Sequence, residues 1–165
     1  MSSYYSASAT VEGLGFAIPI SVAKPIIDEL IENGYVHAIL AGNALATHDL
    51  EAAYLKTALG QDIYTQRSVP NGHYHHLDTI NRVRYHGSIA NFIQNENIHD
   101  GIIYSCEKCG VPYVLGGSIR DDGPLPGVYG DVYAAQNAML YRKQVLFLCV
   151  GQHCSSSLYF FFSAG

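Results

Sequence analysis

The sequence predicts one α/β domain, in which an open parallel sheet is flanked by helices. Short apolar runs typical of buried strands, at residues 35–40, 111–117 and 145–150, alternate with segments of helical periodicity. Strands that alternate with helices pair in parallel through right-handed crossovers. Such sheets bind ligands beyond the carboxyl ends of their strands, where this chain carries Gly42 and Gly116-Gly117. We therefore expect function to reside in these two turns.

The other elements are predicted from apolar spacing and from residues that cap or break helices. Gly34 is expected to end the first helix, and Thr47-His48-Asp49 to cap the second, which Gly60 closes. Residues 61–71 are polar and form a loop. The predicted helices cover residues 22–33, 50–59, 76–95 (as two helices that break near His86-Gly87), 101–109 and 128–140. Residues 1–20 form a poorly defined extension, 21–150 the domain and 151–165 a divergent tail.

The composition narrows the class of protein. Of 165 residues, 48% are apolar and 14% charged, which is typical of a globular domain rather than a disordered chain. The formal net charge of −5 gives no reason to expect a nucleic-acid partner. No apolar run reaches the roughly 20 residues that span a bilayer, so we expect no membrane partner. Four cysteines are too few for a disulfide framework and indicate reduced thiols, hence a cytoplasmic location.

The first turn, Gly42-Asn43-Ala44, follows a predicted strand and leads towards a helix. Small residues there allow backbone N–H groups to approach a phosphate, and the positive end of a helix dipole favours it. A complete G-x-G-x-x-G pattern is absent. A tight turn without a ligand is therefore the alternative interpretation.

The second turn contains several side chains that can bind ligands or transfer protons, close together in the sequence. After Gly117 come Ser118, Arg120, Asp121 and Asp122, in a loop that also contains two prolines. A guanidinium can pair with a substrate carboxylate or a phosphate, and either aspartate can hold ribose hydroxyls or take a proton. The alternative is a structural loop in which these charges satisfy each other. Its position at the ligand-binding edge favours a functional role.

Two groups of potential metal ligands are also present. Residues 72–76 include three histidines, but histidines so close in sequence do not all face one ion, and we expect no metal there. Cys106 and Cys109 have the C-x-x-C spacing of a zinc or redox pair, with Cys149 and Cys154 as a second pair. The first pair lies in a predicted helix and Cys149 in a predicted strand. The combined C-x₂-C…C-x₄-C pattern is not a standard structural zinc spacing, and thioredoxin-like pairs follow a strand and open a helix.

Three segments, taken together, resemble one family. They are LAGNALATHDLE at 40–51, GHYHHLDTIN at 72–81 and VLGGSIRDDGPLP at 114–126, with Asp131 and AQNAM at 135–139. They are similar to the LOR/SDH conserved region. That region forms the C-terminal NAD-binding domain of archaeal ornithine cyclodeaminase and of the cyanobacterial arginine dihydrolase/ornithine cyclodeaminase. The resemblance runs from about residue 22 to residue 139.

The resemblance implies a Rossmann-like fold of the deoxyhypusine-synthase type, present here in part, that binds NAD. It also implies an ammonia-lyase that converts L-ornithine to L-proline, with a hydride transferred to the cofactor and later returned. By matching position, Asn43, Ala44 and Asp122 are expected to contact the cofactor. The wider cofactor set adds three small residues and an aspartate, namely Gly42, Gly117, Ser118 and Asp121. Asp122 is also a catalytic candidate, and Arg120 as a clamp for the ornithine carboxylate is our own hypothesis.

Departures from the family limit what is expected of this chain alone. Family members carry a sizeable region before this domain, so we expect either a homo-oligomer or a missing N-terminal domain. In the divergent tail His153 matches the family only loosely and residues 159–162 resemble nothing in it, and activity of the chain by itself is expected to be weak or absent. Two alternatives stay open. One is a non-catalytic nucleotide-binding module, and the other is a different NAD-dependent oxidoreductase of amino acids or polyamines, such as a saccharopine dehydrogenase-like enzyme.

Overall fold

The computed structural model describes residues 20–117, 124–140 and 147–149 and confirms the predicted parallel α/β architecture. Its main sheet has the strand order β4-β1-β5, with β1 at Ala38–Gly42, β4 at Tyr113–Gly116 and β5 at Phe147–Cys149. Both pairings are parallel. Gly42 lies opposite Gly116 in the register, so β1 and β4 end side by side.

Helices and a small hairpin complete the described part of the chain. The hairpin pairs β2 (Thr57–Ala58) with β3 (Gln61–Asp62) in antiparallel orientation. Among the described helices, none is both long and apolar enough to cross a bilayer. The helices are α1 (Ile20–Glu32), α2 (Asn43–Leu55), the 3₁₀ turn η1 (Gly72–Tyr74), α3 (His75–His86), α4 (Ile89–Asn95), α5 (Ile102–Cys109) and α6 (Val132–Leu140).

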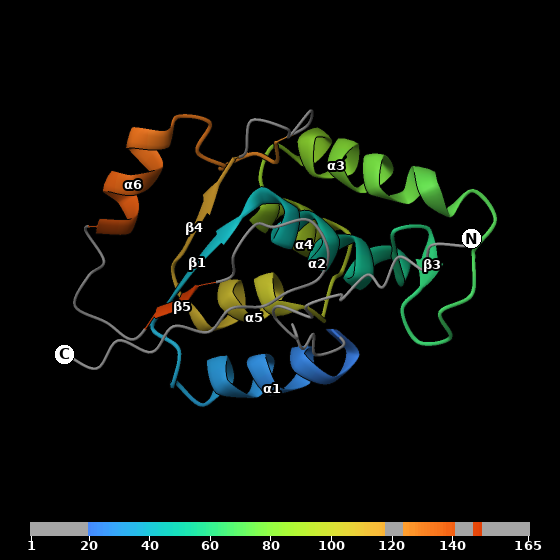
Figure 1. Ribbon diagram of the computed structural model, residues 1–165, viewed down its shortest axis with the longest axis horizontal. Coiled ribbons are helices and arrows are strands. Elements are labelled where there is room, and N and C mark those ends of the chain that lie inside the picture. Colours follow the sequence, from blue (N-terminus) through green and yellow to red (C-terminus); the bar gives the residue numbers. More distant parts are fainter. Residues whose placement is uncertain (1–19, 118–123, 141–146, 150–165) are drawn as a thin grey trace, which may run out of the picture.

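The helices pack on the sheet in a defined order (Figure 1). Helix α5 lies between the strands and α1, α2 packs against both α3 and α5, and α6 packs beside β4. The core between these elements is aliphatic with one aromatic ring. Fully buried examples are Ile39, Leu50, Phe92, Ile103 and Leu115. Helix α2 is therefore the element that connects the sheet edge to the outer helices.

The start of α2 differs from the sequence prediction. The helix begins at Asn43, directly after β1, rather than at residue 50. The predicted cap residue Thr47 lies inside it, where its hydroxyl donates a hydrogen bond to the carbonyl of Asn43 at 2.9 Å. The helix ends at Leu55 because Lys56 adopts a left-handed conformation with φ 58°. Gly60 therefore lies in the hairpin and does not close the helix.

The inward face of α1 consists of residues four positions apart. Ala23, Ile27 and Ile31 are buried, whereas Val22 and Ile26 are more than half exposed. The buried residues recur every four positions, which is the spacing of one ridge of a helix that packs against another helix. Val22, Ile26 and Leu30 lie on the solvent side of α1. The predicted break between two helices near residue 87 is confirmed by the end of α3 and the start of α4.

Candidate functional site

The first turn leads from β1 into α2 without an intervening loop. Gly42 is extended, with φ −95° and ψ 165°, and as the N-cap residue it offers no side chain to the first N–H groups of the helix. Asn43 is only 5% exposed, and its Oδ1 accepts a hydrogen bond from the backbone N–H of Leu125 at 2.9 Å. Ala44 is half-buried beside it. The first turn thus holds the segment that follows the second turn.

The second turn begins at the same edge of the sheet. The N–H of Gly117 donates to the carbonyl of Tyr129 at 2.8 Å, and the N–H of Tyr129 donates to the carbonyl of Leu115 at 2.8 Å. A Cβ atom on Gly117 would lie 3.2 Å from the Tyr129 carbonyl oxygen, so this close approach suits glycine. Tyr129 thus forms an isolated parallel β-bridge with Gly116, so the segment after the loop lies beside the end of β4.

The two turns thus lie at one edge, as the sequence predicts, for the residues that the structure describes. Gly42, Asn43, Ala44 and Gly117 are all at or beside the paired ends of β1 and β4. The remaining predicted site residues, Ser118, Arg120, Asp121 and Asp122, lie outside the described residues. The segments on both sides of them are anchored at this edge, through Gly117 and Leu125.

A second constellation lies between α2 and α3. Glu51 is fully buried, and its Oε2 lies 3.2 Å from His76 Nδ1 and 3.6 Å from His48 Nδ1. Its Oε1 accepts a hydrogen bond from the Thr57 hydroxyl at 3.0 Å. Burial raises the pKa of Glu51, but the contacts with His48, His76 and Thr57 together outweigh it and lower the pKa to about 2. Glu51 is therefore a buried carboxylate surrounded by groups that favour its charge.

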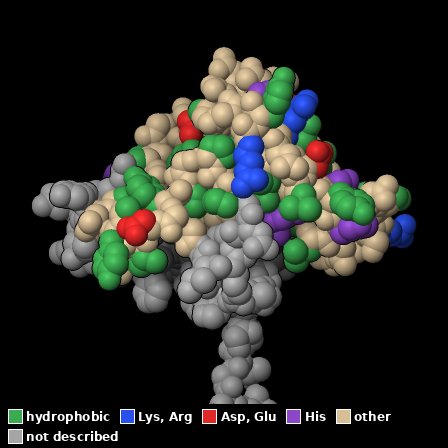
Figure 2. Space-filling model, turned by 90° about the horizontal axis from the view of Figure 1, so that it is seen from above, with side chains coloured by type: hydrophobic (Ala, Val, Ile, Leu, Met, Phe, Trp, Pro, Cys, Tyr) green, Lys and Arg blue, Asp and Glu red, His purple; other side chains and the backbone are tan. Residues whose placement is uncertain are grey.

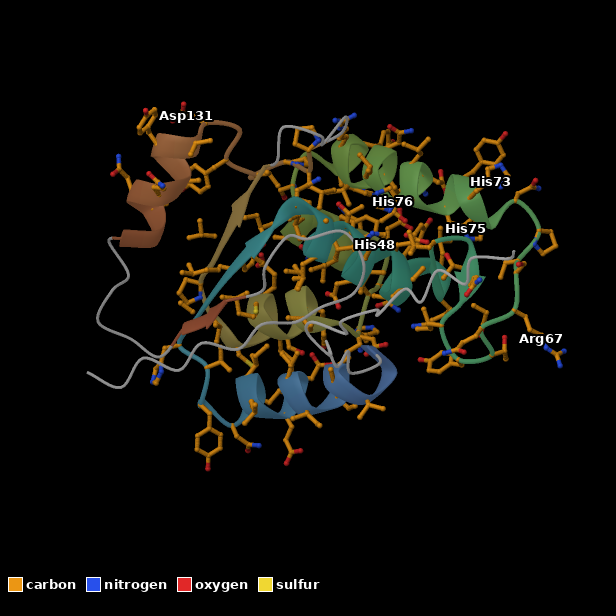
Figure 3. All side chains as sticks on the ribbon, viewed as in Figure 1. His48, Arg67, His73, His75, His76 and Asp131 are labelled. Carbon is orange, nitrogen blue, oxygen red and sulfur yellow. The ribbon has the colours of Figure 1, made fainter. Side chains whose placement is uncertain are left out.

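This constellation is not predicted from the sequence. His48 is predicted as part of a helix cap, whereas it lies within α2, one turn before Glu51. The H-x-x-E spacing inside a helix is the signal that puts the imidazole and the carboxylate on one face. Figure 3 shows His48 and His76 close together between α2 and α3, with His75 and His73 towards the start of α3. In Figure 2, histidine side chains gather towards that same end, whereas lysine and arginine side chains lie scattered.

A second buried carboxylate on α2 serves the packing of α5. Asp49 accepts hydrogen bonds from the backbone N–H groups of Ile102 and Ile103 at 3.0 and 2.9 Å. Burial raises the pKa of Asp49 to about 6, although both of these hydrogen bonds act to lower it. Asp49 thus satisfies the first turn of α5, whose N-cap, Gly101, has no side chain of its own.

The C-x-x-C pair does not present two equivalent thiols. Cys106 is buried on α5, and burial, with a smaller contribution from the charge of Asp49, raises the pKa of its thiol to about 12. Cys109 is exposed at the end of the same helix. The thiols of Cys149 and Cys154 lie outside the described side chains.

Residues 4–154 match the family model described as the arginine dihydrolase ArgZ-like C-terminal domain, with a Rossmann fold. The chain belongs to this family. The match covers most of the chain and confirms the resemblance carried by the three motifs. In this ArgZ-like domain, the parallel strand order and the helix that begins directly after β1 form the edge at which open parallel sheets generally bind ligands.

Relatives of this ArgZ-like domain are considerably longer. It is 45% identical over 143 residues to the ornithine cyclodeaminase of Methanococcus maripaludis, covering 84% of this chain but 34% of the relative. It is 47% identical over 110 residues to the bifunctional arginine dihydrolase/ornithine cyclodeaminase AgrE of a Nostoc species, covering 67% of this chain and 16% of AgrE. The chain therefore spans about a third or less of these relatives.

Solved structures agree with the fold. A LOR/SDH protein from Methanococcus maripaludis superposes with a TM-score of 0.72 at 44% identity, over 76% of this chain and 38% of the other. The complex of AgrE with ornithine and NAD⁺ also gives a TM-score of 0.72, at 39% identity, over 81% of this chain and 20% of AgrE.

Proposed function

We propose that this ArgZ-like chain is the NAD-binding part of an ornithine-cyclodeaminase-type enzyme and that NAD binds where β1 and β4 end. The observation that carries the proposal is the start of α2. A 13-residue helix follows β1 without a loop, and its N-cap, Gly42, supplies no side-chain cap. Backbone N–H groups and the helix dipole at such a position suit a phosphate. The AgrE complex with ornithine and NAD⁺ supports the choice of ligands.

The two turns would contact different parts of NAD. Gly42, Asn43 and Ala44 would hold the phosphates, while Gly117 leaves space at the start of the second loop. In that loop, Ser118, Asp121 and Asp122 would hold ribose hydroxyls. The buried Asn43 keeps the segment at Leu125 beside the first turn through their 2.9 Å hydrogen bond. The two halves of the binding site are thereby held together by a side chain of the first turn.

The proposed reaction converts L-ornithine to L-proline and ammonia. When bound, NAD would supply a hydride acceptor that later returns the hydride, so the reaction involves no net oxidation. Arg120 would pair with the substrate carboxylate, and Asp122 would take a proton from the substrate. An Arg120→Glu change in an enzyme that contains this domain together with its relatives' flanking sequence is expected to abolish ornithine turnover. Unchanged turnover would remove Arg120 from the mechanism.

NAD titration of the purified chain by isothermal calorimetry tests the proposal. Asn43→Asp keeps an acceptor for the Leu125 N–H but adds a negative charge beside the phosphates. We expect NAD affinity to fall at least about tenfold, which corresponds to about 1.4 kcal/mol. Asn81→Asp, the same change at an exposed position of α3, is the control and should leave affinity unchanged. A folded wild-type chain that takes up no NAD contradicts the proposal.

Turnover by the isolated chain separates NAD binding from catalysis. Because the chain spans only 34% of the Methanococcus relative, we expect it to form little or no proline from ornithine without the remaining sequence. Proline formation at a readily measured rate would contradict that expectation. NADH absorbance with a panel of amino acids and polyamines, applied to the longer enzyme, distinguishes ornithine cyclisation from a saccharopine dehydrogenase-like oxidation.

A further inference from the structure

Three metal-ligating side chains converge between α2 and α3. His48 and Glu51 lie one turn apart on α2, and His76 comes from the first turn of α3. One donor atom from each residue lies within 4.8 Å of the other two. The imidazole rings of His48 and His76 are 4.7 Å apart between their centroids, and Figure 3 shows them together. Two helices therefore bring two nitrogens and one oxygen to a common point.

The separations of these donor atoms suit a tetrahedral ion. Zinc binds imidazole nitrogen and carboxylate oxygen at about 2.0–2.2 Å, which places neighbouring ligands of a tetrahedron about 3.3–3.6 Å apart. The Oε2 atom of Glu51 lies 3.2 Å from His76 Nδ1 and 3.6 Å from His48 Nδ1. Both distances are close to tetrahedral edges, and the donor nitrogens of His48 and His76 lie within 4.8 Å of each other.

Burial gives an independent reason to expect a ligand. The Nδ1 atom of His48 is buried and has no hydrogen-bond partner among the described residues. A buried polar atom without a partner is costly, and a native structure rarely contains one without a reason. The Glu51 carboxylate beside it is fully buried, and a buried charge is stabilised by pairing or by metal coordination. A cation at this point would satisfy both groups.

An outer layer of hydrogen bonds already orients the carboxylate. The Thr57 hydroxyl donates to Oε1 of Glu51 at 3.0 Å, which leaves Oε2 directed to the two imidazoles. His75 Nδ1 lies 2.9 Å from the same hydroxyl and can donate to it. Metal-binding carboxylates and imidazoles are commonly held by such outer partners. The imidazole side chains of His48 and His76 are 38% and 36% exposed, so solvent reaches both of them.

We propose that His48, Glu51 and His76 bind a divalent transition-metal ion of the zinc class, with a fourth position open to water. Two imidazoles and one carboxylate suit zinc, whereas calcium and magnesium prefer oxygen ligands. Three protein ligands and one open position are the pattern of catalytic zinc sites. His48 lies five residues after Asn43, about 7.5 Å along the helix axis from the proposed nucleotide-binding edge. The metal site does not depend on the proposed ornithine reaction.

Metal titration of the untagged full chain, first stripped with a chelator, tests the proposal. We expect one Zn²⁺ per chain by calorimetry. Because the exposed Cys109 is a competing ligand, the absorption spectrum of the Co²⁺ complex serves as a check. We expect this spectrum to lack thiolate charge-transfer bands. Glu51→Gln and His76→Asn should each weaken binding by more than about 100-fold. Thr57→Val, which alters only the outer layer, should weaken it by about 10- to 100-fold.

The chain provides a matched control in a second histidine–carboxylate contact. His86 Nε2 lies 2.8 Å from Glu96 Oε1, but that contact is not among the described groups of three ligands. His86→Asn should leave the Zn²⁺ affinity unchanged. A wild-type chain that binds less than one equivalent overturns the proposal, as does full binding by a Glu51→Gln variant whose circular dichroism is native. Should the ligand variants not fold, unaltered affinity in Thr57→Val overturns it.

Discussion

Asp49 and Glu51 lie two residues apart on α2, and both are buried, yet their pKa values shift in opposite directions. Positions two apart on a helix point to nearly opposite sides. Asp49 faces α5, where it accepts two backbone hydrogen bonds. Glu51 faces α3, where two imidazoles and the Thr57 hydroxyl approach its carboxylate. The two sides of one helix thus place carboxylates in different chemical surroundings.

The comparison teaches that partners, rather than burial, distinguish a structural carboxylate from a candidate ligand. The partners of Asp49 are backbone N–H groups of α5, which neither titrate nor bind metal ions. The partners of Glu51 include two imidazoles, a side chain that commonly binds metals, and both imidazoles are partly exposed. We therefore expect changes at Asp49 to affect folding most, and changes at Glu51 to affect binding most.

Replacement of Asp49 is expected to have the largest effect on stability. Asp49→Ala leaves the N–H groups of Ile102 and Ile103 without an acceptor, and each unsatisfied buried group costs about 1–3 kcal/mol. The free energy of unfolding should fall by about 2–6 kcal/mol in urea denaturation followed by circular dichroism. A loss no larger than that of Glu51→Gln would remove the distinction between the two sides of α2.

Gly101 tests how closely α5 approaches Asp49. Its φ of +119° is rare for residues with a side chain, and a Cβ atom would lie 2.8 Å from Asp49 Oδ2. Gly101→Ala should lower the free energy of unfolding by about 3 kcal/mol. Gly110→Ala, at φ +67° with open space around the added atom, is the control and should cost about 1–2 kcal/mol. Equal losses would show that the contact with Asp49 contributes nothing.

The fold is largely predictable because its signals are local. Alternating apolar runs and helical segments predict the parallel sheet, and Gly34 and Gly87, both at positive φ, mark helix ends that the sequence suggests. The start of α2 departs from the prediction for a physical reason. Thr47 is a favourable cap residue, but its hydroxyl instead bonds to the Asn43 carbonyl within the helix.

The site is predictable only in part. The glycine-bearing turns follow strands whose carboxyl ends meet, so their common edge is predictable from topology. The contact between His76 and Glu51 joins residues 25 apart on two helices. It depends on how α3 packs against α2, which local periodicity does not determine. Because the sequence predicts His48 in a helix cap rather than inside a helix, the H-x-x-E spacing does not suggest that His48 and Glu51 share one helix face.

A conservative change at Glu51 should have a small effect on folding. In metal-free Glu51→Gln protein, the side-chain amide oxygen can still accept the hydrogen bond from Thr57, while the charge-assisted contact with His76 is weakened. The substitution should therefore lower the free energy of unfolding by about 1 kcal/mol in the same urea experiment. A loss comparable with that of Asp49→Ala would mean that Glu51 is primarily structural.

The last prediction concerns the reactivity of the two thiols of α5 and involves no substitution, so it disturbs the protein least. Their reactivity reports whether α5 stays packed against the side of α2 that carries Asp49. Cys106 is buried, and its raised pKa of about 12 leaves almost no thiolate at about pH 8, whereas Cys109 is exposed. Iodoacetamide at that pH should modify Cys109 and spare Cys106 in the folded chain, as read by peptide mass mapping. Urea should make both reactive. Rapid modification of Cys106 in native protein would mean that α5 separates readily from α2, contrary to a rigid anchor at Asp49.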